Sequence, residues 1–184
     1  VTLLGGADVH GEAEIPSLLR RGELVTVADG GKYLMLELPS DVVPSKLDQL
    51  LFGIQLQGAR PIISHPERNR VIQDDPAELI SLVQAGCFVQ VTAASILGDM
   101  GSRAEECAKA LFDYQLVHLV ATDMHNTRHR RPRLSDAAEW VRGALDSEEA
   151  EEILDRNPEA VIHGGHIEAA DPVPPKPRKK WLFW

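Results

Sequence analysis

The sequence predicts an α/β fold built on a parallel β-sheet, and two observations support this prediction. Short apolar segments rich in β-branched residues alternate with longer segments whose apolar residues recur every three or four positions. Polar residues close four expected strands at intervals of about 30 residues, roughly the length of one strand and its crossover helix; they are Glu37, His65, Thr92 and Asp123. This rhythm is typical of βαβ units, in which the carboxyl ends of the strands lie at one edge of the sheet.

The expected strands are short and are bounded by polar residues, glycine or proline. Four buried strands are expected over residues 33–38, 61–64, 88–92 and 117–122. Residues 1–4 are expected to be the remnant of an earlier strand. Asp8 follows that remnant after two glycines and an alanine, so its carboxylate is expected near the end of this strand.

Helices are expected between and after these strands. The first spans residues 47–56 and is closed by Gly58. The second spans residues 77–85, with Asp75 as its N-cap, a proline in its first turn and Gly86 at its end. The three remaining helices are expected over residues 102–115, 135–145 and 148–156.

Composition narrows the class of protein. The formal net charge of −9 disfavours nucleic acid as a partner, because duplex binding needs a basic face. The two cysteines, Cys87 and Cys107, form no CxxC motif, so neither a disulfide framework nor a thiolate zinc site is indicated. No apolar run approaches the roughly 18 residues that span a bilayer. A soluble protein of the reducing cytoplasm is expected.

The chain is expected to contain one domain and a tail. Residues 1–168 carry the strand and helix pattern, whereas residues 169–184 are rich in proline and end in a basic, aromatic segment. This tail has two open interpretations: peripheral contact with an anionic membrane surface, or a tail that packs on the domain or hangs free. Because the sequence opens at Val1 without a methionine, a longer parent protein is expected.

Five side chains at or near the expected strand ends are candidate metal ligands: Asp8, Glu37, His65, Asp123 and His125. Mixed imidazole and carboxylate ligands suit manganese, iron or zinc better than magnesium or calcium. Such ions lower the pKa of bound water and stabilise the oxygens of a transferring phosphoryl group. Each motif is ambiguous by itself, because an Asp-x-His sequence also caps turns and a single buried histidine is usually satisfied by a neighbour.

Arginines close to these ligands are candidates for binding phosphate. Arg68 follows His65 by three residues, and Arg131 or Arg133 follows His125 in a basic run. The alternative for the basic run is a solvated loop. A nucleophilic role for Thr92 or Ser95 is not favoured, because no base is evidently paired with either. Neither cysteine lies in a Cys-x5-Arg loop, so water is the expected nucleophile.

Four sequence blocks resemble one enzyme family: GKYLMLELP (31–39), ARPIISHPERNR (59–70), VQVTAASILG (89–98) and LVATDMHNTRHRRPRL (119–134). They are similar to blocks of the polymerase-and-histidinol-phosphatase (PHP) type protein-tyrosine phosphatases of bacterial capsule and exopolysaccharide gene clusters. The resemblance implies a distorted seven-stranded β/α barrel and a cluster of metal ions, commonly manganese. It also implies hydrolysis of phosphotyrosine on a tyrosine autokinase.

The resemblance implies metal-ligand roles for Glu37, His65, Asp123 and His125, and Asp8 stands where the family usually has glutamate. The family's N-terminal His-x-His motif and a second histidine block do not occur here, and the remaining histidines lie in other blocks. The first strands of the barrel are therefore expected to be missing. Two alternatives stay open: a small-molecule phosphoesterase of the same fold, and a catalytically inactive domain that binds a kinase.

Overall fold

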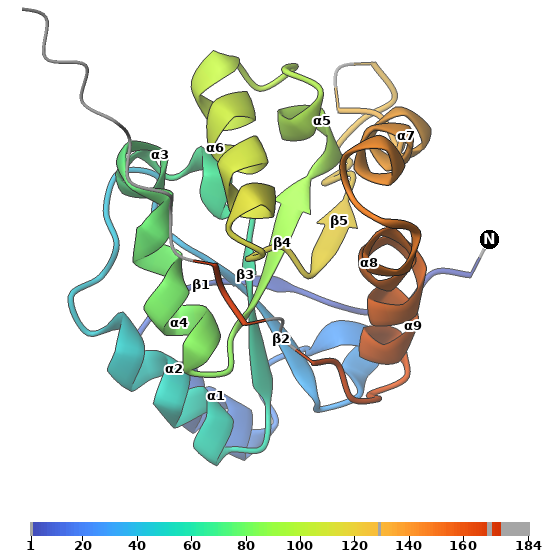
Figure 1. Cartoon of the computed structure of the whole chain (residues 1–184). Helices are drawn as coiled ribbons and strands as arrows, with labels where there is room; N and C mark the ends of the chain where they lie inside the picture. Colours follow the sequence, from blue (N-terminus) through green and yellow to red (C-terminus); the bar gives the residue numbers. More distant parts are fainter. Residues whose placement is uncertain (1, 129, 169–170, 174–184) are drawn as a thin grey trace, which may run out of the picture.

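The computed structural model describes residues 2–128, 130–168 and 171–173. Its centre is a parallel sheet of five strands in the order β1-β2-β3-β4-β5 (Figure 1). The predicted α/β class with a parallel sheet is confirmed. The strands are β1 (Asp8–His10), β2 (Tyr33–Glu37), β3 (Arg60–Ser64), β4 (Phe88–Thr92) and β5 (Leu119–Ala121).

The four strands predicted in the body of the chain are present, with β4 at its predicted bounds and β5 shorter at both ends. The prediction for the first strand is wrong. Residues 2–7 form no strand, and β1 begins only at Asp8, which pairs with Met35 of β2. Two consecutive glycines in the segment before β1 lack the side chains that a strand packs against its neighbours. Asp8 therefore opens a strand instead of following one.

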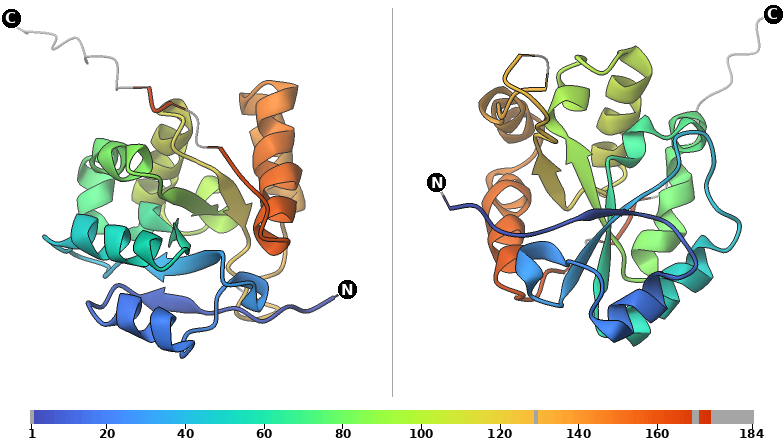
Figure 2. Two further views of the ribbon diagram at one scale, coloured as in Figure 1. Left: turned by 90° about the horizontal axis from the view of Figure 1, so that it is seen from below. Right: turned by 180° about the vertical axis from the view of Figure 1, so that it is seen from behind.

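The helices cover both faces of the sheet, and they lie in the connections between its strands and after β5 (Figures 1 and 2). All five expected helices have counterparts, of which α2, α6 and α7 begin at the predicted residues. The elements are α1 (Ile15–Arg21), η1 (Val27–Asp29), α2 (Leu47–Leu56), η2 (Pro66–Arg68), α3 (Arg70–Asp74), η3 (Pro76–Leu79), α4 (Ile80–Gln84), α5 (Ala93–Ile96), α6 (Ser102–Asp113), α7 (Ser135–Ala144), α8 (Ser147–Glu151), η4 (Glu152–Arg156) and α9 (Asn157–Ile162).

Two expected helices are divided. The helix predicted over residues 77–85 is a 3-10 turn, η3, followed by α4, and Asp75 caps η3 by accepting a hydrogen bond from the Ala77 amide. The helix predicted over residues 148–156 is α8 followed by η4, which is a π-helical turn, and the chain continues as α9. A π turn inside a helical run places an extra residue in one turn.

Alternate residues of each strand face two separate cores. Leu34, Ile63 and Val89 belong to the larger cluster on one face, whereas their neighbours Tyr33, Ile62 and Phe88 belong to a smaller cluster on the other. This alternation follows from the two-residue period of a strand. Burial on both faces is typical of parallel sheets. It holds the carboxyl ends of the strands in one row.

The strand order matches the order in which strands follow one another around a β/α barrel. In the described part of the chain, β1 and β5 are the two edges of an open sheet. None of the helices in the described ranges is long and apolar enough to cross a membrane. Most of the proline-rich tail, residues 169–170 and 174–184, lies outside the described residues.

Candidate metal and phosphate site

Candidate ligands from neighbouring strands meet at one edge of the sheet. Glu37 is the last residue of β2, His65 follows β3 directly, and Asp123 comes two residues after β5. His65 and Asp123 both have a left-handed backbone, with φ of 33° and 47°. Non-glycine residues adopt this conformation uncommonly, and backbone strain of this kind clusters at functional sites. At both positions the chain turns sharply as it leaves the sheet.

The first group of side chains surrounds His65. Its Nε2 atom lies 3.5 Å from Oδ2 of Asp8 and 3.5 Å from Oε1 of Glu37. Ser64 donates a hydrogen bond of 2.9 Å to the other oxygen of Asp8. His65 is almost completely buried, whereas both carboxylates are partly exposed. The structure thus brings three predicted ligands together around one imidazole nitrogen.

His10 joins this group, although sequence reasoning did not include it among the ligands. Its Nδ1 atom lies 3.2 Å from Oε2 of Glu37. The signal was present in the sequence, because His10 and Asp8 are two residues apart in a short strand and therefore project to the same face. The signal was missed because β1 was placed at residues 1–4.

The second group of side chains surrounds Asp123. Oδ2 of Asp123 accepts a hydrogen bond of 2.7 Å from Arg68 and another from Arg130. The Nδ1 atom of His125 lies 2.9 Å from the Asp123 carbonyl and 3.6 Å from its Oδ1 atom. The two groups are adjacent, since Arg68 lines one small pocket together with Glu37 and His65.

Arg130 pairs with Asp123, whereas the sequence offered Arg131 or Arg133 as phosphate-binding arginines. In the described residues, neither of these two contacts Asp123: Arg131 donates to the Arg128 carbonyl at 2.6 Å, and Arg133 pairs with Asp136. The chain reverses between His125 and Arg130, whose carbonyl accepts hydrogen bonds from the His125 and Asn126 amides. This reversal brings Arg130 to Asp123, and the spacing of residues along the sequence does not reveal the reversal.

The HPERN segment positions Arg68 through its neighbours. Glu67 is buried, and its Oε1 accepts a hydrogen bond of 3.0 Å from the Thr92 amide at the end of β4. Asn69 caps α3 by accepting bonds from the amides of Val71 and Ile72. The side-chain Nδ2 of Asn69 also donates hydrogen bonds to two carbonyls of the loop after β2, those of Pro39 and Val42. Glu67 and Asn69 therefore connect the segment after β3 with the end of β4 and with the loop after β2.

Replacing Glu67 with glutamine should stabilise the protein by about 1 kcal/mol at pH 7. Burial raises the pKa of the Glu67 carboxyl, and its Oε2 atom has no hydrogen-bond partner in the described residues. A raised pKa means that Glu67 favours the folded state below the unfolded pKa of glutamate, and this contribution is lost as pH rises through the folded pKa. The gain in Glu67→Gln should therefore vanish below about pH 4.

Urea unfolding at pH 7 and at pH 3.5 measures this difference. Glu106→Gln, which removes an exposed carboxylate on α6, is the matched control and should change stability little at either pH. A Glu67→Gln protein that is less stable than the parent at pH 7 would show that the ionised carboxylate is needed at this position.

The other nucleophile candidates stay disfavoured. Thr92 and Ser95 are buried, so neither hydroxyl is exposed to a substrate. Burial raises the pKa of both Cys87 and Cys107 to about 12, so both remain neutral thiols at physiological pH. Their burial as free cysteines agrees with the expected absence of a disulfide framework.

The residues around His65 suit a divalent ion by their chemistry. Donor atoms sharing one tetrahedral ion lie about 3.4 Å apart, because each is about 2.1 Å from the metal. Both 3.5 Å distances around His65 are close to this value. Across the described ranges, however, no three histidine, cysteine or carboxylate side chains are arranged to hold one ion. Asp123 is the ligand candidate whose Oδ2 atom is engaged by two guanidinium groups, which leaves its Oδ1 atom, 3.6 Å from Nδ1 of His125, for an ion.

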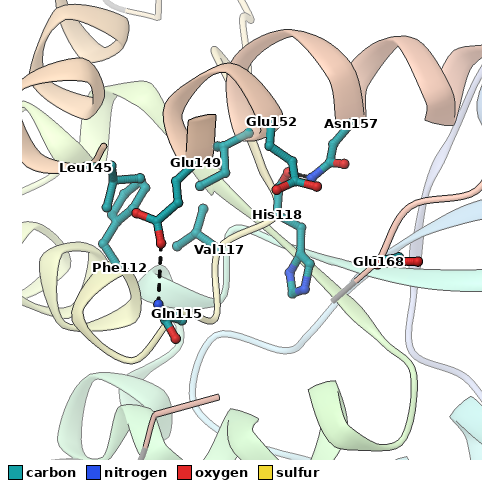
Figure 3. Close-up of a pocket in the computed structure, with 10 residues that line it drawn as sticks. Phe112, Gln115, Val117, His118, Leu145, Glu149, Glu152, Asn157 and Glu168 are labelled. Atoms are coloured by element: carbon teal, nitrogen blue, oxygen red, sulfur yellow. Dashed lines mark hydrogen bonds between the residues drawn. The ribbon is translucent and has the colours of Figure 1, made fainter. Parts of the chain in front are cut away.

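A separate pocket lies at the amino end of β5, away from the carboxyl ends of the strands where the site lies (Figure 3). It includes His118, which directly precedes β5, whereas Asp123 and His125 of the site follow that strand. Its walls combine apolar side chains such as Phe112 and Val117 with carboxylates such as Glu149 and Glu152. None of the predicted site residues lines this pocket.

Known proteins are similar to this chain in sequence and in fold. The chain is 32% identical to tyrosine-protein phosphatase YwqE of Bacillus subtilis over 182 residues, which cover 99% of this chain and 71% of that protein. It is 33% identical to putative tyrosine-protein phosphatase CapC of Staphylococcus aureus over 151 residues, which cover 82% of this chain and 59% of that protein.

Crystal structures of YwqE from Bacillus subtilis and CpsB from Streptococcus pneumoniae, described as unique metal-dependent tyrosine phosphatases, provide a structural match. The TM-score is 0.88 at 32% identity, over 94% of this chain and 69% of the matched chain. The family model of capsular polysaccharide synthesis, CpsB/CapC, matches residues 1–163. The chain therefore belongs to the CpsB/CapC family of capsular polysaccharide synthesis.

Proposed function

We propose that this protein is a metal-dependent protein-tyrosine phosphatase that hydrolyses phosphotyrosine with an activated water. The observation that carries the proposal is the adjacency of two kinds of groups at the carboxyl edge of the sheet. His65 and its two carboxylates supply ligands that suit a divalent ion, and Arg68 beside them supplies a cation that suits a phosphate. Relatives named tyrosine-protein phosphatase support the same activity.

Each residue of the site has a proposed role. The metal-holding residues are Asp8, Glu37, His65, Asp123 and His125, and the bound ions supply Lewis acidity and lower the pKa of water. Arg68 and Arg130 bind the non-bridging phosphate oxygens through their guanidinium groups. Asp123 orients both arginines through its Oδ2 atom. His10 positions Glu37 through its Nδ1 atom.

Finer features of the proposal rest on the donor set and the family. Manganese is the proposed metal, with iron or zinc as alternatives, because the ligands mix imidazole and carboxylate. The proposed substrate is a tyrosine autokinase of exopolysaccharide synthesis. A cytoplasmic location is supported by two buried free thiols. The sheet is proposed to form part of a distorted PHP-type barrel, which its sequential parallel order supports.

Chelation is the experiment that tests the proposed activity. Dialysis against EDTA should lower the hydrolysis of a phosphotyrosyl peptide about a hundredfold or more, and manganese should restore it. Metal content measured on the same samples should fall and recover in parallel. Comparison with small phosphomonoesters separates a protein phosphatase from a small-molecule phosphoesterase of this fold. Full activity in excess chelator would contradict the metal-dependent mechanism.

A second candidate function is a catalytically inactive domain that binds a kinase. The observation in its favour is that, over the described parts of the chain, no three side chains are arranged to hold one ion. This alternative predicts neither bound metal nor turnover, together with metal-independent binding of a tyrosine-rich kinase segment. The metal analysis in the preceding experiment separates the two candidates.

A further inference from the structure

A hollow rich in arginine adjoins the candidate site. It is lined by residues of the loop that connects β5 with α7, of α5 and of the segment that follows α5. Its charged lining residues are Arg128, Arg130, Arg131, Arg133, Asp99 and Asp136. Arg130 belongs to this hollow and to the group around Asp123, so the hollow continues directly from the proposed phosphate-binding arginines.

The lining arginines are not all neutralised. Arg130 pairs with Asp123, and Arg133 pairs with Asp136. Arg128 and Arg131, in contrast, have no carboxylate partner in the described part of the chain. The Nε atom of Arg131 donates to the Arg128 carbonyl at 2.6 Å, which holds the Arg131 guanidinium beside this loop. Two positive charges of the hollow thus remain available to an anion.

The local charge also opposes the charge of the whole protein. The formal net charge is −9, so an anionic substrate is repelled by most of the surface. The lining itself has an excess of positive side chains. A concentrated positive region on an acidic protein selects where an anion approaches.

We propose that this hollow binds a second anionic group of the substrate, beside the phosphotyrosine held at Arg68 and Arg130. This proposal rests on the proposed phosphatase function and adds a substrate preference to it. The anionic group is a carboxylate or a second phosphate on the same peptide, and Arg128 and Arg131 are the residues that bind it. Apolar side chains such as Leu97 border the charged groups.

Peptide binding under metal-free conditions tests the subsite independently of turnover. Three fluorescent peptides share one phosphotyrosine and carry flanking glutamates, flanking glutamines, or a second phosphotyrosine. Fluorescence anisotropy in EDTA measures their dissociation constants for the full chain. The glutamate and doubly phosphorylated peptides should bind about fivefold more tightly than the glutamine peptide, and 0.5 M salt should reduce this preference.

The double variant Arg128→Gln/Arg131→Gln should abolish the preference between peptides. Its matched control is Arg20→Gln/Arg156→Gln, which removes two exposed arginines from α1 and η4 and should retain the preference. Preference for the second phosphate alone would identify phosphate as the ligand, and equal preference for glutamate would identify simple anion recognition. Equal binding of all three peptides to the parent protein overturns the subsite.

Kinetics on the manganese-loaded protein distinguish failure of the subsite from failure of the proposed function. With the subsite present, the preference should be seen in KM and should disappear in Arg128→Gln/Arg131→Gln. If all three peptides are hydrolysed with equal KM, the phosphatase function stands and the subsite is wrong. If none is hydrolysed while the anisotropy preference persists, the subsite stands and the proposed function fails.

Discussion

Replacing His65 with asparagine should lower kcat for phosphotyrosine hydrolysis about a hundredfold or more and should reduce the bound metal. His65 contacts both Asp8 and Glu37 through one nitrogen atom, so its loss removes the group that these two carboxylates share. Asparagine is the informative replacement because it tolerates the left-handed backbone better than other non-glycine residues. Alanine at φ 33° would add backbone strain to the loss of the imidazole.

The measurement combines steady-state kinetics, metal analysis and thermal unfolding of the same preparations. His163→Ala, which removes an exposed histidine after α9, is the control and should retain metal content and kcat. A His65→Asn protein with a normal melting temperature and low activity places the effect in the site. Normal metal content and activity in His65→Asn would remove His65 from the metal-holding residues.

The candidate site could be predicted from the sequence where strand periodicity alone positions a side chain. Glu37 and His65 lie at the ends of adjacent parallel strands, so a correct strand assignment brings them to one edge. Arg130 could not be predicted in this way, because a loop reversal brings it to Asp123 while its neighbour Arg131 lies elsewhere. Loop conformation depends on backbone hydrogen bonds that spacing does not encode.

The fold could be predicted where apolar periodicity is strong and failed where it is weak. β4 has a continuous buried run from Phe88 to Thr92, and its bounds were predicted correctly. β1 has only three residues, and its middle residue Val9 is the partly buried one, so its sequence carries little periodic signal. The apolar residues of 1–4 were more prominent, but Leu3 and Leu4 are exposed. The hydrophobic residues of 1–4 have no partner strand, and relying on their hydrophobicity placed β1 too early in the chain.

A buried histidine at the amino end of β5, His118, should control the stability of the protein in acid. His118 is 3% exposed, and its Nδ1 atom accepts a hydrogen bond of 3.1 Å from the Val89 amide. The ring is therefore neutral with its proton on Nε2, which has no partner in the described residues. The ring also packs edge-on against Phe88 at 5.1 Å between centroids (Figure 3 shows His118 in its pocket). Protonation of Nδ1 would break the bond to Val89.

Burial lowers the pKa of His118 from 6.5 to about 4 in the folded protein. Between these two values the unfolded chain binds the proton and the folded chain does not, so acid favours unfolding. The stability that neutral His118 contributes is present above pH 6.5 and is lost as pH falls toward 4. The loss should reach about 3 kcal/mol at pH 4, a large share of the 5 to 15 kcal/mol that typically separates folded and unfolded states.

His118→Asn tests this contribution, because the asparagine oxygen can still accept the Val89 hydrogen bond and does not titrate. The variant should be less stable than the parent at pH 7, since it leaves a cavity beside Phe88. Its stability should nevertheless fall less steeply between pH 7 and pH 4. The difference between the two urea-unfolding profiles isolates His118, because Glu67 and the surface carboxylates titrate in both proteins. Parallel profiles would contradict this prediction, because they would mean that His118 has the same pKa in the folded and unfolded chains.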